Sequence, residues 1–263
     1  MIANFFQSLS DNGAEYLLIS GQATVLYGAA TFSEDIDLWI NPTPENCGRF
    51  TAALRQCHAR FYKLTPVLSA ENLTRGHGFH FLLSDAKNSE IFLDVMGNPP
   101  RVGAFIGSMQ TAQWMETEWG LVRTIGIKPL VELKKTQRLE DYPIIGKLAL
   151  AWFDQPQCGK TADDVRWAIQ NIFTLPELKN FFTEQPDAIA VTLEGLNPAL
   201  KELGSQWLSG VPVDESIEAG VNNWMQQRIA ALQQADRRYW RDIISDLKNL
   251  RFSGKLAPEG SLV

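Results

Sequence analysis

The segment from Tyr16 to Ile40 constrains the fold of this chain more than any other. A short apolar strand, Tyr16 to Ile19, runs into Gly21, a stretch compatible with a helix continues to Gly28, and a second strand is predicted over Ser33 to Ile40. The order of strand, helix and strand indicates a sheet with a helix beside it. Glycine has no Cβ atom, and the free N–H groups at a helix amino terminus favour anions, so the turn at Gly21 is suited to a phosphate group.

Two carboxylates lie one residue apart at the start of the second strand. Side chains alternate between the faces of a strand, so Asp35 and Asp37 point the same way while Ile36, Leu38 and Ile40 line the other face. Adjacent anions repel unless a proton or a cation lies between them, and carboxylate oxygens bind hard divalent ions such as Mg²⁺. The pair therefore indicates a metal site. The alternative is two solvent-facing aspartates on an edge strand.

Two further features support the metal interpretation. Asp94 lies in Glu90 to Met96, a strand that is otherwise apolar on both faces, where a carboxylate is costly to bury unless it is paired or metal-bound. Lys134 to Asp141 is a basic cluster on or after a helix, and it could neutralise a triphosphate. Asp94 could instead pair with a core arginine, and Lys134 and Arg138 could belong to a solvated helix face.

The first half of the chain alternates helical and strand patterns. Ile2 to Leu9 has helical spacing, and Thr43-Pro44 opens a helix that is predicted to run to about Ala59. Strands are predicted over Phe79 to Leu83 and Glu90 to Met96, joined by the turn-rich Ser84 to Ser89, which indicates an antiparallel pair. A further strand over Leu121 to Ile127 precedes a helix from Pro129 toward Arg138.

Beyond about residue 143 the strand pattern ends. Thr161 to Asp164 resembles a capping box, a long helical stretch is predicted within Asp214 to Leu250, and the tail from Ser253 to Val263 is predicted to be loosely ordered. We therefore expect an α/β (α+β) domain with a mixed twisted sheet over residues 1–143. An all-helical domain is expected over residues 144–263.

Residues 14–145 resemble the nucleotidyltransferase superfamily that includes DNA polymerase β. They are most similar in pattern to the small bacterial nucleotidyltransferases of the AbiEii toxin type. The residues that carry the resemblance are Ser20-Gly21-Gln22, Ser33 to Leu38, the strand aspartate Asp94, and the Leu133-Lys134 helix that leads to Arg138 and Asp141.

The resemblance implies a role for each of these residues. Asp35, Asp37 and Asp94 would be the catalytic carboxylates and would hold two Mg²⁺ ions. The nucleotide would be bound by six residues: Gly21, Gln22, Ser33, Lys134, Arg138 and Asp141. The chain departs from the family pattern at Gln22, where glycine or serine is usual. It also departs at Thr31 and Ser33, where arginine and threonine are common.

The function implied by the resemblance is Mg²⁺-dependent transfer of a nucleoside monophosphate from a nucleoside triphosphate to an acceptor hydroxyl, with release of pyrophosphate. Asp94 would receive the hydroxyl proton. The acceptor stays open among RNA, a protein side chain and a small molecule, because acceptor choice lies outside the metal-binding core. A toxin-antitoxin or phage-defence role with an antitoxin partner is implied by analogy. The alternative is an inactive nucleotide-binding or regulatory protein that retains the fold.

Net charge, cysteine spacing and histidine spacing narrow the classes of function and location that remain. A formal net charge of -6 argues against wide, non-specific nucleic-acid binding but leaves room for a local basic patch. Asp236 to Arg241 could be such a patch, although a salt-bridged helix surface is the favoured interpretation of this segment. The three cysteines lack zinc or disulfide spacing, and neither a secretory signal nor a membrane span is evident, so a cytoplasmic protein is expected. His77 and His80 do not fit a zinc motif, and a substrate-loop role for Arg75 and His77 is an alternative.

Overall fold

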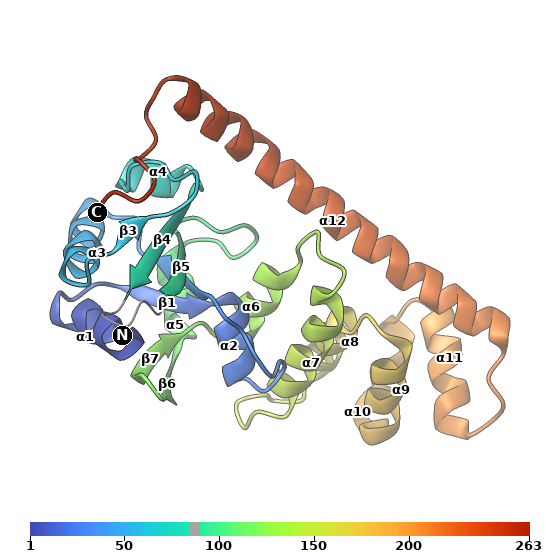
Figure 1. Cartoon of the computed structure of the whole chain (residues 1–263). Helices are drawn as coiled ribbons and strands as arrows, with labels where there is room; N and C mark the ends of the chain where they lie inside the picture. Colours follow the sequence, from blue (N-terminus) through green and yellow to red (C-terminus); the bar gives the residue numbers. More distant parts are fainter. Residues whose placement is uncertain (85–89) are drawn as a thin grey trace. The chain divides into compact units, whose positions relative to one another are not determined.

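The computed structural model describes residues 1–84 and 90–263. These residues contain a mixed seven-stranded sheet with the order β3-β4-β5-β2-β1-β7-β6 (Figure 1). The strands are β1 (Tyr16–Ile19), β2 (Ile36–Ile40), β3 (Arg60–Phe61), β4 (Gly78–Ser84), β5 (Glu90–Met96), β6 (Gln113–Thr117) and β7 (Gly120–Thr124).

Helices connect and follow these strands. The helices that precede residue 135 are α1 (Ile2–Asp11), α2 (Ser20–Leu26), α3 (Pro44–Gln56), α4 (Ala70–Thr74), α5 (Phe105–Gln110) and α6 (Ile127–Lys134). The later ones are α7 (Asp141–Phe153), α8 (Ala162–Asn171), α9 (Leu175–Glu184), α10 (Pro186–Ala190), η1 (Leu193–Gly195), α11 (Pro198–Ser209) and α12 (Glu215–Phe252).

The chain divides into two compact units. The first unit comprises residues 1–26, 30–133 and 238–263, and the second comprises residues 27–29 and 134–237. The last part of α12 therefore groups with the sheet, although it follows the helical region in sequence. The predicted domain boundary near residue 143 stays a prediction.

The centre of the sheet combines parallel and antiparallel pairs. β2 is antiparallel to β1 and parallel to β5, while β4 is antiparallel to β5. All four residues of β1 are buried, as expected for a strand with neighbours on both sides. Helix α3 begins where the sequence predicted, because Thr43 accepts a hydrogen bond from the Asn46 amide and Pro44 occupies the first turn.

The carboxy-terminal tail is held against the outer strand of the sheet. The Phe61 amide donates to the carbonyl of Ser261, the Val263 amide donates to the carbonyl of Ala59, and Arg60 forms a β-bridge with Leu262. The prediction of a loosely ordered tail is therefore wrong. The edge strand β3 has backbone groups that need partners, and the tail supplies them.

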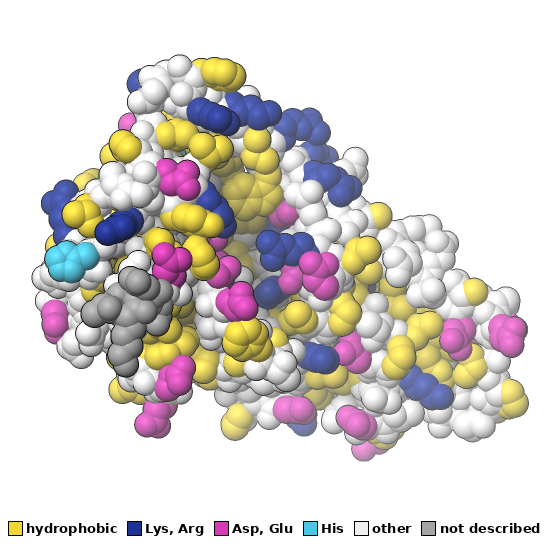
Figure 2. All heavy atoms as spheres, viewed as in Figure 1, with side chains coloured by type: hydrophobic (Ala, Val, Ile, Leu, Met, Phe, Trp, Pro, Cys, Tyr) yellow, Lys and Arg dark blue, Asp and Glu magenta, His cyan; other side chains and the backbone are white. Residues whose placement is uncertain are grey.

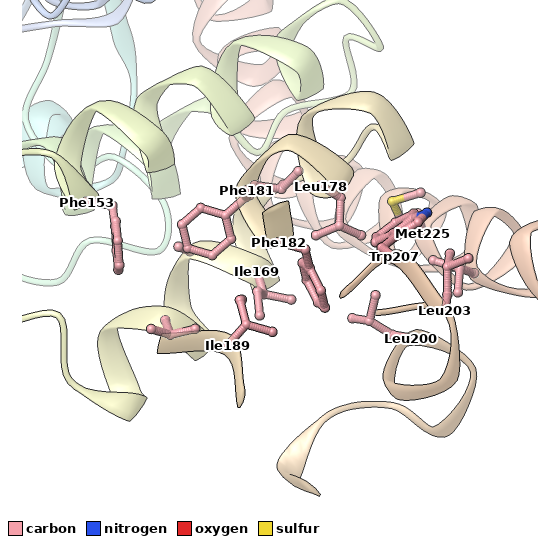
Figure 3. Close-up of a cluster of buried hydrophobic side chains, with 14 of the residues drawn as sticks. Phe153, Ile169, Leu178, Phe181, Phe182, Ile189, Leu200, Leu203, Trp207 and Met225 are labelled. Atoms are coloured by element: carbon pink, nitrogen blue, oxygen red, sulfur yellow. The ribbon is translucent and has the colours of Figure 1, made fainter. Parts of the chain in front are cut away.

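The second unit has its own apolar core, built from the helices α7 to α11 and the first part of α12 (Figure 3). Phe182 packs edge-on against Trp207, and Phe153 packs in the same way against Phe181. The predicted capping box of α8 is confirmed, because Thr161 accepts from the Asp164 amide and Asp164 accepts from the Thr161 amide.

The structure confirms the predicted fold class, which is an α/β protein with a mixed sheet and a helical carboxy-terminal region. It also confirms the antiparallel pairing of β4 with β5. The predicted turn over Ser84 to Ser89 lies, from residue 85 on, outside the described residues. Strands β3 and β6 were not predicted. Among the described residues, none of the helices is both long and apolar enough to cross a membrane.

The cysteines are free thiols, as the sequence predicted. Burial raises the pKa of the Cys47 thiol and of the Cys57 thiol above the ordinary value, so both favour the protonated, less reactive form. Neither contributes to the site described next.

Candidate active site

A row of polar side chains crosses three neighbouring strands. Asp37 of β2 is the register partner of Asp94 in β5, and Asp94 is the register partner of His80 in β4. Register partners on adjacent strands lie about 4.8 Å apart and project to the same face of a sheet. The pairing therefore sets two carboxylates and an imidazole side by side, although Asp37 and Asp94 are far apart in sequence.

His80 is bonded to the second of these carboxylates. Its Nδ1 atom lies 2.7 Å from Asp94 Oδ1, and both side chains are about one-third exposed. An ionised carboxylate only accepts hydrogen bonds, so Nδ1 donates to it in this arrangement. The contact fixes the orientation of Asp94 and leaves its second oxygen directed elsewhere.

The polar row opens into a cavity of about 250 Å³ in the first unit. Asp37, Asp94 and His80 line its sheet side together with Ile19. The carboxy-terminal part of α12 contributes four apolar residues to the lining: Trp240, Ile243, Ile244 and Leu247. The cavity thus has acidic groups on one side and apolar groups on the other, as many small-molecule sites do.

Polar contacts anchor this part of α12. Asp246 accepts from Arg75 at 2.5 Å and is bonded to His77 at 2.6 Å, and the Tyr239 hydroxyl donates to the carbonyl of Asn98 at 2.5 Å. His77 is almost fully buried, so its bond to Asp246 satisfies a polar group that would otherwise be costly. Arg75 and His77 therefore hold the helix that lines the cavity.

The glycine turn lies where β1 ends and β2 begins. Ile19, the last residue of β1, pairs with Asp37, and α2 starts at the next residue, Ser20, which has a positive φ of 57°. A Cβ atom added to Gly21 would overlap the Ser33 hydroxyl, and Gln22 Nε2 donates to the Ser33 carbonyl at 2.7 Å. The predicted residues Gly21, Gln22 and Ser33 are thus brought together.

Asp35 lies outside this arrangement. It precedes the first residue of β2, is exposed, and does not line the cavity. Over residues 1–84 and 90–263 no three acidic, cysteine or histidine side chains are grouped as a metal ion would require. Asp37 and Asp94 carry oxygen atoms of the kind that bind Mg²⁺, and they are two of the three predicted ligands; the metal site stays a prediction.

The remaining predicted nucleotide-binding residues belong to the second unit, and two of them pair with each other. Lys134 Nζ lies 3.1 Å from Asp141 Oδ1, and the Thr136 hydroxyl donates to Asp141 Oδ2 at 2.7 Å. Both charged side chains are nearly buried, and Asp141 begins α7. Arg138 is exposed. A nucleotide-binding role for the three residues stays a prediction.

Sequence reasoning missed His80 and the cavity-lining part of α12. His80 could have been placed opposite Asp94 only if the ends of both strands were known, because a shift of one residue moves a side chain to the other face. The apolar positions Trp240, Ile243 and Leu247 have helical spacing, which indicates a buried stripe but does not identify its partner.

The chain is similar in structure to an antigenic nucleotidyltransferase-like protein from Paracoccidioides brasiliensis. The two are 15% identical with a TM-score of 0.40, and the match covers 73% of this chain and 90% of that chain. No family model matches the chain, and no curated protein matches it in sequence.

Proposed function

We propose that the first unit is a nucleotidyltransferase that uses Mg²⁺ to transfer a nucleoside monophosphate from a nucleoside triphosphate to an acceptor hydroxyl. The observation that carries the proposal is the parallel pairing of β2 with β5. It sets Asp37 and Asp94 side by side on the wall of a cavity. The Gly21 turn follows β1, whose last residue, Ile19, pairs with Asp37.

Each residue has a role that its surroundings support. Asp37 and Asp94 would hold the divalent ion, whereas Asp35, which is exposed before β2 and does not line the cavity, is assigned to the ion by the sequence resemblance alone. Mg²⁺, when bound, would offset the charge of the phosphates and make the acceptor hydroxyl more acidic. Asp94 would accept the hydroxyl proton, and His80 would keep the Asp94 carboxylate oriented for that step.

The turn at Gly21 would receive the phosphates. Gly21 closely approaches Ser33, and Gln22 is committed to the Ser33 carbonyl, so the backbone around this turn is fixed before any ligand arrives. Preorganised N–H donors bind an anion without further ordering cost. A nucleotide-binding role for Lys134, Arg138 and Asp141 rests on the sequence resemblance alone.

The second candidate function is an inactive protein that retains the fold and binds a nucleotide. It is favoured by the missing third ligand among the described residues and by the bond between His80 and Asp94, which occupies one carboxylate oxygen. An antitoxin partner and a role in phage defence are extensions of the first proposal that rest on the sequence resemblance alone. A cytoplasmic location rests on the sequence pattern and stays a prediction.

The test is pyrophosphate release from each labelled nucleoside triphosphate, with Mg²⁺ and cell extract as the source of acceptors. We expect Asp37→Asn and Asp94→Asn each to lower turnover at least about 100-fold, because the charge that holds the ion is removed. The matched control is Glu90→Gln, an exposed carboxylate on the same strand as Asp94, which should keep full turnover.

Thermal shift separates the two candidates. A ligand that binds only the folded state raises the apparent stability. The enzyme should be stabilised by nucleotide and Mg²⁺ together, and Asp37→Asn should abolish the Mg²⁺-dependent part. Stabilisation by nucleotide alone, with no pyrophosphate released, would support the inactive protein. Full turnover in Asp37→Asn would refute the proposed site.

A further inference from the structure

One face of the last turns of α12 is basic and exposed. It comprises Arg238, Arg241, Lys248 and Arg251, which follow one another at spacings of three, seven and three residues. Such spacings place side chains on one side of a helix. Figure 2 shows Lys and Arg side chains gathered along this part of α12. We refer to these four residues as the basic face.

Within residues 1–84 and 90–263 the basic face has no acidic partner. Among the described residues, none of its four side chains forms an ion pair. Asp242 is exposed and stands four residues after Arg238, yet no ion pair joins the two in the described part of the chain, and Asp246 is held by Arg75 and His77. The sequence favoured a salt-bridged surface over Asp236 to Arg241. Asp236 accepts from Gln137, whereas Arg238 and Arg241 form no ion pair with any described residue.

The charge of this region is opposite to that of the whole chain. Residues 238–263 contain five Lys or Arg and three Asp or Glu, whereas the full sequence contains 24 and 30. An exposed cluster of unpaired like charges is unfavourable in isolation, because its members repel one another. It is stabilised by an anionic partner, so the basic face is suited to a ligand with several negative charges.

The geometry favours a soluble polyanion over a membrane surface. A helix that lies on a membrane needs a free apolar face beside its basic one. Here the apolar residues Trp240, Ile243 and Leu247 line the cavity and face the sheet of the same unit. Ile244 and Phe252 are exposed, but two apolar side chains eight residues apart do not form a continuous apolar face.

We propose that the basic face binds the phosphate backbone of a nucleic acid strand. Thirteen residues of helix separate Arg238 from Arg251, which is about 20 Å at the rise of an α-helix. Four cations over that length match a polymer with regularly spaced phosphates better than a compact anion. RNA and DNA share this chemistry, and the experiment below distinguishes them.

The position of the basic face relates it to the candidate active site. Ile244 lines the cavity, and it lies in sequence between Arg241 and Lys248, so the basic face borders the cavity within one unit. Ile244 and the carboxylates of Asp37 and Asp94 line the same cavity. If the proposed function holds, the acceptor hydroxyl belongs to a nucleic acid, and this identification of the acceptor rests on that function.

The test is fluorescence anisotropy with labelled single-stranded RNA and DNA of equal sequence, in EDTA, at about 50 to 200 mM salt. We expect the triple variant Arg241→Ala, Lys248→Ala and Arg251→Ala to weaken binding at least about tenfold at the lowest salt. The plot of log affinity against log salt should lose about 2 units of slope, since each phosphate contact to a single strand contributes about 0.7.

Two controls keep the interpretation specific. A second triple variant, Arg49→Ala, Lys147→Ala and Lys179→Ala, removes the same formal charge from exposed positions elsewhere and should bind like the parent. Asp37→Asn should also retain binding, since it disables the proposed chemistry but not the basic face. Oligonucleotide binding by the parent protein without pyrophosphate release would overturn the proposed function alone, and release without oligonucleotide binding would overturn the role of the basic face alone.

Other outcomes overturn the proposal. Equal weakening by the two triple variants would show that net charge, and not the basic face, governs binding. Binding to vesicles of anionic lipid, or to polyglutamate, with no binding to either oligonucleotide would assign the face to a membrane or an acidic protein. A preference of the parent protein for RNA over DNA, or the reverse, identifies the source of the phosphates. Far-ultraviolet circular dichroism verifies that every variant is folded.

Discussion

The two units place their polar residues differently. In the first unit, Asp37, Asp94 and His80 stand together on a sheet and open into a cavity. In the second unit, the centre is an apolar cluster in which Phe153, Phe181 and Phe182 pack against neighbouring helices (Figure 3). Both units bury apolar side chains, such as Phe50 and Phe79 in the first, but the first unit also lines a cavity with adjacent acidic groups.

The difference indicates where stability and chemistry reside. Adjacent carboxylates repel one another unless a proton, a cation or a hydrogen-bond donor lies beside them, and His80 supplies such a donor to Asp94. Packed aromatic rings are favourable for folding and perform no chemistry. Substitutions in the second unit should therefore change the free energy of unfolding, and substitutions in the polar row should change turnover.

The largest expected effect on stability is from Phe182→Ala. Phe182 is fully buried, packs against Trp207, and closely approaches Gly204, so its removal leaves a cavity that the helices cannot fill. We expect a loss of about 3 to 5 kcal/mol in urea denaturation. Phe252→Ala, at an exposed position, is the control and should change stability by less than about 0.5 kcal/mol. A small effect of Phe182→Ala would contradict the contrast between the units.

The second-largest loss of stability is expected when the Lys134–Asp141 pair is broken. Asp141→Asn leaves the nearly buried Lys134 without its counter-charge, and we expect a loss of about 3 kcal/mol in the same measurement. The double variant Lys134→Met, Asp141→Asn should recover part of that loss, because no unpaired charge remains. A double variant that is less stable than Asp141→Asn would show that the pair is not coupled as its geometry indicates.

A smaller effect is expected at the start of α8. Thr161→Ala removes the hydroxyl that accepts from the Asp164 amide, and the expected loss is about 1 kcal/mol. Thr183→Ala removes an exposed hydroxyl that is bonded only to carbonyls of its own helix and serves as the control. Equal effects of the two substitutions would argue against a specific role for the cap.

The smallest effect on stability is expected at Asp94. Asp94→Asn keeps the shape of the side chain and removes a charge that lies beside Asp37, so stability should change by less than about 1 kcal/mol while turnover is lost. Thermal denaturation and pyrophosphate release should be measured on the same preparation. A large destabilisation would mean that Asp94 is a structural partner of His80 and would weaken the distinction between the two units.

Local patterns predicted much of the fold. The capping box at Thr161, the helix start at Thr43-Pro44 and the antiparallel pair of β4 and β5 all depend on residues close in sequence, and all are confirmed. Strand β3 is too short to show a pattern, and β6 mixes exposed and partly buried residues, so neither was recognised.

The candidate site was predicted only in part, because it depends on long-range register. Periodicity placed Asp35 with Asp37, but the strand begins at Ile36, and Asp35 is exposed before it. Nothing in a single sequence indicates that the end of α12 returns to the sheet, because that packing is between segments more than 100 residues apart. The contribution of Trp240 to the cavity could therefore not be foreseen.

The parallel pairing of β2 with β5 also has a consequence for the order of folding. Asp37 and Asp94 become neighbours only when β2 pairs with β5, and the chain between them includes β3 and β4. Closing so long a loop has an entropic cost. The β4–β5 pair is local in sequence and should form early, whereas the pairing of β5 with β2 should form late. A nascent chain that has emerged from the ribosome only as far as β2 would contain Asp37 but not yet Asp94. The carboxylate pair could therefore not form at that stage.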